Sequence, residues 1–216
     1  MFPFAKAFGI LAIFPLISHS AVIINEIDYD NVITDNAEFI ELFNDGPTAV
    51  DISGYVIVGI NGNGNTVYNV FATVPAATSV SAGGYYVIGS SLVASRNLTF
   101  VAPADNIQNG SPDAVGLYSG GTFAVGNPST TNNSLLVSGI LYEGAADPIN
   151  YPNFTAPGAA LADSNSSNFS FGRDGTGSFA VLIAPTPGAV NAAPVPEPTV
   201  PLLAGLAALG MMRRRR

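Results

Sequence analysis

Short runs of β-branched and aromatic residues dominate the central part of this 216-residue chain, and glycine, asparagine and proline separate them. No long stretch places apolar residues at three- and four-residue intervals, which is the spacing of an amphipathic helix. Many short strands with turn-rich connections predict an all-β fold, either a sandwich or a barrel. The predicted strands are Val22–Asp30, Ala37–Asn44, Tyr55–Ile60, Thr66–Phe71, Tyr85–Ser90, Leu98–Val101, Ala114–Tyr118, Thr122–Val125, Leu135–Tyr142 and Phe179–Ile183.

The two-residue period of a strand assigns side chains to faces in the first two predicted strands. In the strand Ala37–Asn44, the carboxyl groups of Glu38 and Glu41 point to opposite sides and make a poor acid/base pair. In the strand Val22–Asp30, one face carries Ile23, Asn25, Ile27 and Tyr29, and the other carries Glu26, Asp28 and Asp30.

Residues 1–21 predict a secretory signal peptide. A short start that contains Lys6 is followed by an apolar run over residues 7–17 and then by small and polar residues. Eleven apolar residues are too few to cross a bilayer core of about 30 Å as a helix. We therefore expect an N-terminal signal helix, export of the chain, and cleavage after Ser20 or Ala21.

The last 21 residues, 196–216, contain a Pro-Glu-Pro motif, an apolar stretch that predicts a short hydrophobic helix, and four arginines. As a helix of about 21 Å, the apolar stretch is short for a permanent membrane span. The three parts, in this order, resemble the PEP-CTERM protein-sorting signal of bacteria. The residues that carry the motif and the basic end are Pro196, Glu197, Pro198, Arg213, Arg214, Arg215 and Arg216.

This resemblance implies that an exosortase-type transpeptidase of a Gram-negative bacterium recognises the tail. It also implies delivery to the cell envelope or extracellular matrix, with transient membrane association through the C-terminal helix. The alternative is a retained tail anchor. Residues 192–198, which contain three prolines, predict a stiff stalk between the domain and this tail.

The formal net charge of −8 combines regions of unlike charge. Lys6 lies near the start and four arginines end the chain. Residues 22–191 contain fourteen acidic side chains and only two basic ones, Arg96 and Arg173, and so carry a charge near −12. Binding to a phosphate backbone requires clustered Lys and Arg, so we expect no nucleic-acid partner.

The composition also excludes most kinds of catalytic site. The chain has no cysteine, and its only histidine, His19, lies in the predicted signal peptide. A mature protein without His, Cys or Lys cannot form a Ser-His-Asp triad, a Cys-His pair, a His-ligated metal site or a Schiff base. Carboxylate pairs and oxygen-bound metals remain, and we expect neither enzymatic activity nor a cofactor other than weakly bound calcium.

Five oxygen-bearing side chains fall within ten residues at the end of the first predicted strand. Calcium takes six to eight oxygen ligands and tolerates irregular geometry, so this density predicts a weak calcium site, although its spacing differs from an EF-hand loop. The alternative is an acidic strand edge and loop that face solvent. The candidate ligands are Glu26, Asp28, Asp30, Asn31 and Asp35.

Three segments near the N-terminus resemble the opening of a lamin tail domain. They read Ile-Asn-Glu-Ile at 24–27, Ala-Glu-Phe-Ile-Glu-Leu-Phe-Asn at 37–44 and Asp-Ile-Ser-Gly-Tyr at 51–55, and the Pro-Gly-Ala-Val-Asn sequence at 187–191 is similar to the family's usual end. The resemblance implies an immunoglobulin-like antiparallel β-sandwich with long loops over residues 22–191. Bacterial members of the family are secreted, often as accessory modules beside hydrolases.

The sequence thus predicts an exported, envelope- or matrix-associated protein with a binding or structural function and no catalysis of its own. Extracellular polysaccharide and surface proteins are the expected ligands, together with the sorting enzyme. The alternatives are an accessory scaffold for a separate secreted hydrolase and a weak calcium-binding surface domain.

Overall fold

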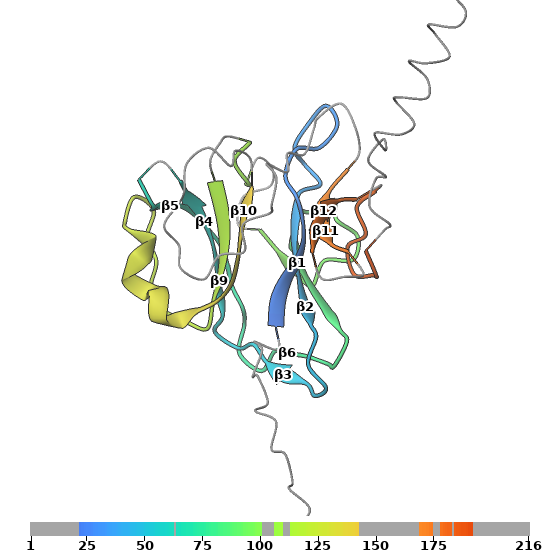
Figure 1. Ribbon diagram of the computed structural model, residues 1–216, viewed down its shortest axis with the longest axis horizontal. Helices are drawn as coiled ribbons and strands as arrows, with labels where there is room; N and C mark the ends of the chain where they lie inside the picture. The colour runs from blue at the N-terminus through green and yellow to red at the C-terminus, as the bar shows by residue number, and fades with distance from the viewer. Residues whose placement is uncertain are drawn as a thin grey trace, which may run out of the picture.

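The computed structural model describes residues 22–62, 64–100, 106–109, 113–142, 169–174, 178–182 and 184–191. These residues form two packed β-sheets with a small two-stranded ribbon at one end (Figure 1). The predicted signal helix and the predicted C-terminal hydrophobic helix lie outside the described residues. Within the described ranges, no helix has the length and apolar character that a membrane crossing requires.

The first sheet has six strands in the order β12-β11-β1-β2-β7-β8. All neighbours are antiparallel except β7 and β8, where Ile88 lies opposite Leu98 in a parallel pair. In sheet order the strands are β12 (Phe179–Val181), β11 (Phe171–Arg173), β1 (Val22–Asp28), β2 (Phe39–Asn44), β7 (Tyr85–Gly89) and β8 (Leu98–Thr99).

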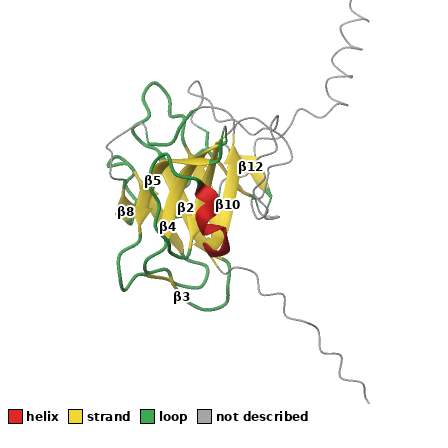
Figure 2. Cartoon of the chain, turned by 90° about the vertical axis from the view of Figure 1, so that its left-hand side faces the viewer, coloured by secondary structure: helices red, strands yellow, loops and turns green. Residues whose placement is uncertain are grey.

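The second sheet has four antiparallel strands in the order β10-β9-β4-β5. A 3-10 helix, η1 (Ser129–Leu135), precedes β10 in the chain and lies beside it (Figure 2). The strands are β10 (Leu136–Tyr142), β9 (Asp113–Tyr118), β4 (Val56–Asn61) and β5 (Thr66–Thr73), and the small ribbon pairs β3 (Val50–Asp51) with β6 (Ser79–Val80).

The main core lies between the two sheets, where alternate residues of facing strands are fully buried. Burial of these aliphatic and aromatic side chains supplies the principal driving force for the sandwich, at roughly 1.5–3 kcal/mol for each large side chain. The largest contributors include Ile24, Ile27, Tyr29, Ile40, Leu42, Ile57, Phe71, Ile88, Leu117, Ile140 and Phe171.

Each large sheet also carries a small apolar cluster on the opposite face. On the four-stranded sheet, Val58 and Ile60 pack with residues of the segment that leads into β10, including Phe123 and Leu135. On the six-stranded sheet, the cluster consists of Phe39, Val87 and Val93. The outer face of the six-stranded sheet is therefore partly covered by a turn that contains Val93.

A β-bulge in β1 changes the expected assignment of faces. The register of β1 against β2 shifts between Ile24 and Glu26, so that Asn25 is an extra residue in β1. The bulge places Ile24 in the core, where strict alternation places Ile23, and the expectation for Ile23 is therefore wrong. As a result, Asn25 and Glu26 are both free to bond to the C-terminal end of the domain.

The predicted strands are present, with ends that differ by a few residues, except for Thr122–Val125. That segment forms a loop, with a turn closed by the Asn127 N–H and the Ala124 carbonyl, and Phe123 packs on Tyr118 at a ring separation of 4.6 Å. Its alternating apolar residues cover an existing sheet instead of extending it.

A substitution at Gly59 in β4 tests how closely β4 packs against Tyr68 of β5. A Cβ atom at this position would lie 2.2 Å from Cζ of Tyr68. We expect Gly59→Ala to lower the free energy of unfolding by roughly 1–3 kcal/mol, measured by urea denaturation. In a Tyr68→Leu background the same substitution should cost less, because the ring is gone. An equal loss in both backgrounds would contradict this explanation.

Candidate functional site

The C-terminal end of the domain, residues 184–191, lies against β1, β2 and the turn after β7, and we call it the strap. Ser95 of that turn donates a hydrogen bond to the Pro187 carbonyl at 2.6 Å. At the end of the strap, Asn191 donates to the carbonyl of Arg173, and its side-chain oxygen accepts a 2.9 Å bond from Asn25. The strap is therefore held at both its middle and its end.

Two carboxylates from the first two strands hold the rest of the strap. Glu26 accepts from the Thr186 backbone N–H at 2.9 Å and from the Thr186 hydroxyl at 2.8 Å. Glu41 accepts from the Gly188 N–H at 2.6 Å and from Asn25 at 2.7 Å. Because Glu26 and Glu41 are opposite one another in the β1–β2 pair, they form one acceptor surface for the strap.

Burial dominates the electrostatics of this pair. The pKa of Glu41 is raised to about 7, chiefly by burial and in smaller part by the neighbouring Glu26 carboxylate, against the hydrogen bonds from Asn25 and Gly188, which lower it. Burial likewise raises the pKa of Glu26, against the hydrogen bonds from Ser170 and Thr186. The pair is thus partly protonated near neutral pH, which limits the repulsion between two acids in one site.

Glu38 has different partners from Glu41, as the alternation predicts. Its carboxylate accepts the backbone N–H groups of Asn106 and Ile107, each at 2.8 Å, and the Asn106 side chain at 3.2 Å. Burial raises the pKa of Glu38 to about 7. Glu38 therefore holds residues 106 and 107 against the start of β2, and it is not part of the strap site.

The five candidate calcium ligands do not converge on one point. Asp28, Asn31 and Asp35 are joined within one loop, because Asn31 donates from its side chain to Asp28 at 2.6 Å and from its backbone to Asp35 at 2.8 Å. Asn109 lies between two of the acids, with its amide nitrogen 2.8 Å from Asp35 and 3.5 Å from Asp30. Glu26 is separate from this loop and bonds to the strap.

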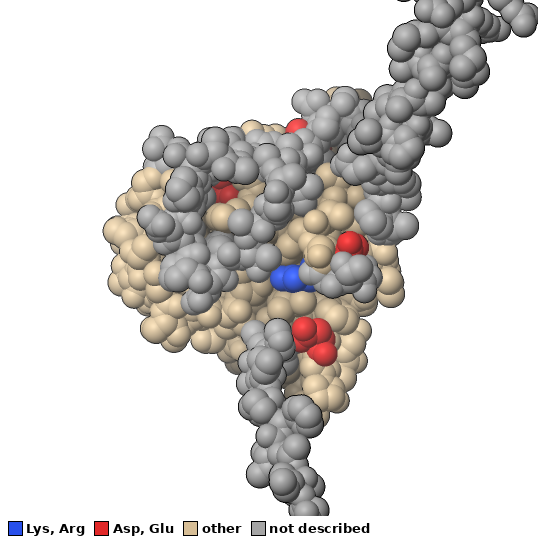
Figure 3. Space-filling view, in the orientation of Figure 1, with Lys and Arg blue, Asp and Glu red and all other residues tan. Residues whose placement is uncertain are grey.

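The described residues contain no group of three or more acidic side chains arranged to hold a metal ion. The alternative, an acidic edge that faces solvent, is wrong for part of this segment. Glu26 and Asp28 are buried, as are Glu38, Glu41 and Asp113 elsewhere in the domain. Figure 3 accordingly shows a face whose described surface is mostly uncharged. The acids near the N-terminus serve largely as internal hydrogen-bond acceptors.

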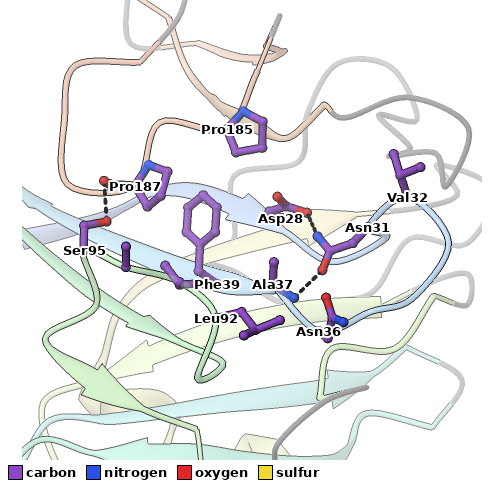
Figure 4. Close-up of a pocket in the computed structure, with 12 residues that line it drawn as sticks. Asp28, Asn31, Val32, Asn36, Ala37, Phe39, Leu92, Ser95, Pro185 and Pro187 are labelled. Atoms are coloured by element: carbon purple, nitrogen blue, oxygen red, sulfur yellow. Dashed lines mark hydrogen bonds between the residues drawn. The ribbon is translucent and has the colours of Figure 1, made fainter.

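A hollow of about 440 Å³ opens between the Asn31–Ala37 loop, the turn after β7 and the strap. Figure 4 shows the Phe39 ring in the hollow, with Pro185 and Pro187 on one side and Leu92 on the other. Asp28 and Asn31 provide its main polar groups. Nothing in the sequence analysis indicated this hollow, because its residues come from three distant segments.

Exposed apolar side chains border the hollow. Leu92 is 63% exposed, and Val32 is also exposed at the opposite rim. Ile33, next to Val32, is 93% exposed and has a φ of +77°, a left-handed conformation that costs a β-branched residue roughly 1–3 kcal/mol. The fold thus maintains a strained, apolar loop tip beside a partly apolar hollow.

The fold and the strap together define an immunoglobulin-like β-sandwich module. Residues 17–127, just over half of the chain, match the family model of the Lamin Tail Domain, and the chain belongs to that family. Residues 194–216 match the PEP-CTERM protein-sorting motif. The protein is therefore exported and sorted by an exosortase-type system.

No curated protein matches the chain. Among solved structures, a DUF4876 family protein from Bacteroides thetaiotaomicron is similar, with 10% sequence identity and a TM-score of 0.47. The alignment covers 85% of this chain and 74% of that one.

The buried carboxyls predict a pH dependence of stability. Glu38 and Glu41 have pKa values near 7 in the folded protein and ordinary values near 4.5 when unfolded, so folding favours the protonated form. The free energy of unfolding should therefore fall as pH rises from 5 to 8, by at most roughly 3 kcal/mol for each carboxyl. Urea denaturation across this range measures the effect.

Glu41→Gln should reduce this dependence, because the amide cannot ionise. Asp51→Asn is the control, since Asp51 is exposed and its pKa is lowered by hydrogen bonds from Ser53. Stability that rises with pH between 5 and 8 in the wild-type protein would contradict the assignment.

Proposed function

We propose that this protein is an envelope- or matrix-associated binding protein without catalytic activity, and that the hollow beside the strap is its binding surface. The observation that carries the proposal is the pair of exposed apolar side chains that line the hollow, Leu92 and Val32, with the strained and exposed Ile33 next to Val32 in the chain. Exposed apolar groups gathered at the rim of a hollow, beside a strained loop tip, are features of binding surfaces.

The engagement of the acids supports a role without catalysis. Glu26, Glu38 and Glu41 each accept backbone N–H groups from a distant segment of the chain. A carboxyl that holds the fold in this way is not available as a general acid or a nucleophile. The predicted mature chain also lacks His, Cys and Lys.

The character of the hollow favours a polypeptide over a polysaccharide ligand. Sugar-binding surfaces commonly present an aromatic ring for stacking, but Phe39, the aromatic residue in the hollow, is almost fully buried. The exposed groups are the aliphatic Leu92 and Val32, with proline at the strap side. Aliphatic and proline side chains suit the apolar side chains of a protein partner.

Leu92→Asp should abolish binding to the partner with little effect on folding, because Leu92 is exposed. Val125→Asp is the matched control, since Val125 is 66% exposed and does not line the hollow. The measurement is quantitative recovery of envelope components by the immobilised full chain and both variants, followed by mass spectrometry and sugar analysis. Equal loss of binding in both variants would contradict the assignment of the surface.

The same recovery distinguishes the remaining functions. A secreted hydrolase recovered in stoichiometric amounts, and lost with Leu92→Asp, makes the protein an accessory scaffold for that enzyme. Polysaccharide recovered without protein contradicts the proposed polypeptide ligand. Hydrolysis of a glycan, phosphoester or nucleic-acid panel by the purified chain contradicts the absence of catalysis.

Calcium is a second candidate ligand, favoured by the approach of Asp30 and Asp35 to the Asn109 amide. Rotation of that amide would present its oxygen beside the two carboxylates, a donor set that calcium accepts. We expect millimolar calcium to raise the melting temperature, and Asp30→Asn with Asp35→Asn to remove the rise. Asp51→Asn, at an exposed acid, should keep it. No calcium-dependent shift in the wild-type protein would disprove this site.

A further inference from the structure

The strap has a second consequence, because it is the last part of the domain before the sorting motif. Asn191 is held by Asn25 and Arg173, and only residues 192–195 separate it from Pro196. The preceding attachment to the sheet is at Leu182, whose N–H donates to the Ser170 carbonyl at 2.8 Å. The bonds of the strap therefore decide where the link to the motif begins.

We propose that the strap is a latch that sets the length of the tether between the folded domain and the sorting motif. When the strap is closed, we count the tether from Asn191, the last described residue, and Pro196 is five residues further along the chain, at most about 17 Å away. When the strap is open, the tether begins at Leu182 and contains fourteen residues, which reach at most about 48 Å.

This difference matters because of the size of the domain. A domain of this length has a radius of gyration of about 15 Å, which is close to the full reach of the closed tether. A sorting enzyme that binds the motif on the closed form must work against the surface of the domain. On the open form, the motif extends well beyond that surface, so opening the strap increases access to the motif.

A small number of hydrogen bonds hold the latch closed. Its central contacts are the Thr186 and Gly188 N–H groups on Glu26 and Glu41, and its end contact is Asn191 on Asn25. The two carboxylates and the Asn25 amide come from β1 and β2, and the strap also bonds to Ser95 and to the Arg173 carbonyl. The latch can therefore close only when the N-terminal strands have paired, which links access to the tail with the folded state of the domain.

The inference concerns access to the motif and adds no chemical step to the sorting reaction. It is independent of the binding function proposed above, because the hollow can fail to bind a partner while the strap still sets the tether. It rests on the sorting motif and on the contacts of the strap.

Gly188→Pro opens the strap without altering the carboxylates. Proline removes the N–H that bonds to Glu41, and its fixed φ near −65° is incompatible with the φ of +84° at this position. Gly126→Pro is the matched control, because Gly126 has a φ of +85° and donates its N–H to the Val67 carbonyl of β5. It lies in a turn beside the other sheet, far from the strap in the sequence.

Opening of the strap is measured first, on the full chain. The Thr186 amide should exchange with solvent at least tenfold faster in Gly188→Pro than in the wild-type protein or the Gly126→Pro control. The chain has no cysteine, so spin labels at Ala94→Cys and Val195→Cys report one distance. That distance should lengthen and broaden in Gly188→Pro alone.

Processing of the tail in the producing cell is then followed by pulse labelling and intact-protein mass. We expect processing of Gly188→Pro to be several-fold faster than that of wild type and of Gly126→Pro. A nine-residue Gly/Ser insertion after Asn191, as long as residues 183–191, should give the same acceleration with the strap closed. In the Gly188→Pro background the insertion should add little, because the tether is already long.

The insertion variant keeps the test decisive even if Gly188→Pro does not fold. Wild-type or slower processing of the insertion variant overturns the proposal, because its tether is longer whatever the strap does. Fully additive effects of the insertion and Gly188→Pro on the rate of processing also overturn it. Both changes lengthen the same tether, so the second change should add little to the first.

Discussion

The contact between two buried carboxylates and the strap organises this domain. Glu26 and Glu41 lie side by side in the first strand pair, and burial makes both of them costly unless donors satisfy them. The donors come from Thr186 and Gly188, about 150 residues later in the chain. The sandwich must therefore be complete before its first two strands are fully satisfied, which joins the two ends of the domain in one cooperative unit.

The same principle explains the unusual use of acidic residues. The domain is strongly acidic, yet several of its carboxyl groups are buried. Glu38 accepts the backbone N–H groups of residues 106 and 107, just as Glu26 and Glu41 accept those of the strap. A buried carboxyl can accept several backbone N–H groups at once, which makes it an effective joint between segments that share no sheet. The surface beside the strap is instead defined by apolar groups such as Leu92 and Ile33.

Much of the architecture was predictable from local patterns, since a period of two residues and turn-forming breaks mark strands wherever they are long enough. Two-residue strands such as Val50–Asp51 are too short to show this pattern, so the sequence does not predict them. The apolar alternation of Thr122–Val125 predicts a strand, but the segment is a loop, because a loop that covers a sheet also needs apolar residues. The bulge at Asn25 was also invisible, because register depends on the partner strand. Within the candidate site, the sequence marks Glu26 as one of five closely spaced oxygen-bearing side chains. It does not indicate the bond to Thr186, because that residue is 160 positions away.

The sequence by itself determined the all-β class, the family and the sorting signal, because strand periodicity and short motifs are properties of neighbouring residues. Only the tertiary structure decided what the motif residues do. Burial depends on segments that are distant in the chain, so the sequence leaves Glu26 open to two interpretations, a solvent-facing edge or a metal ligand. In the structure the strap covers it. The same distance in sequence hid the hollow, whose walls at residues 31–37, 92–95 and 185–187 meet only when the sandwich closes.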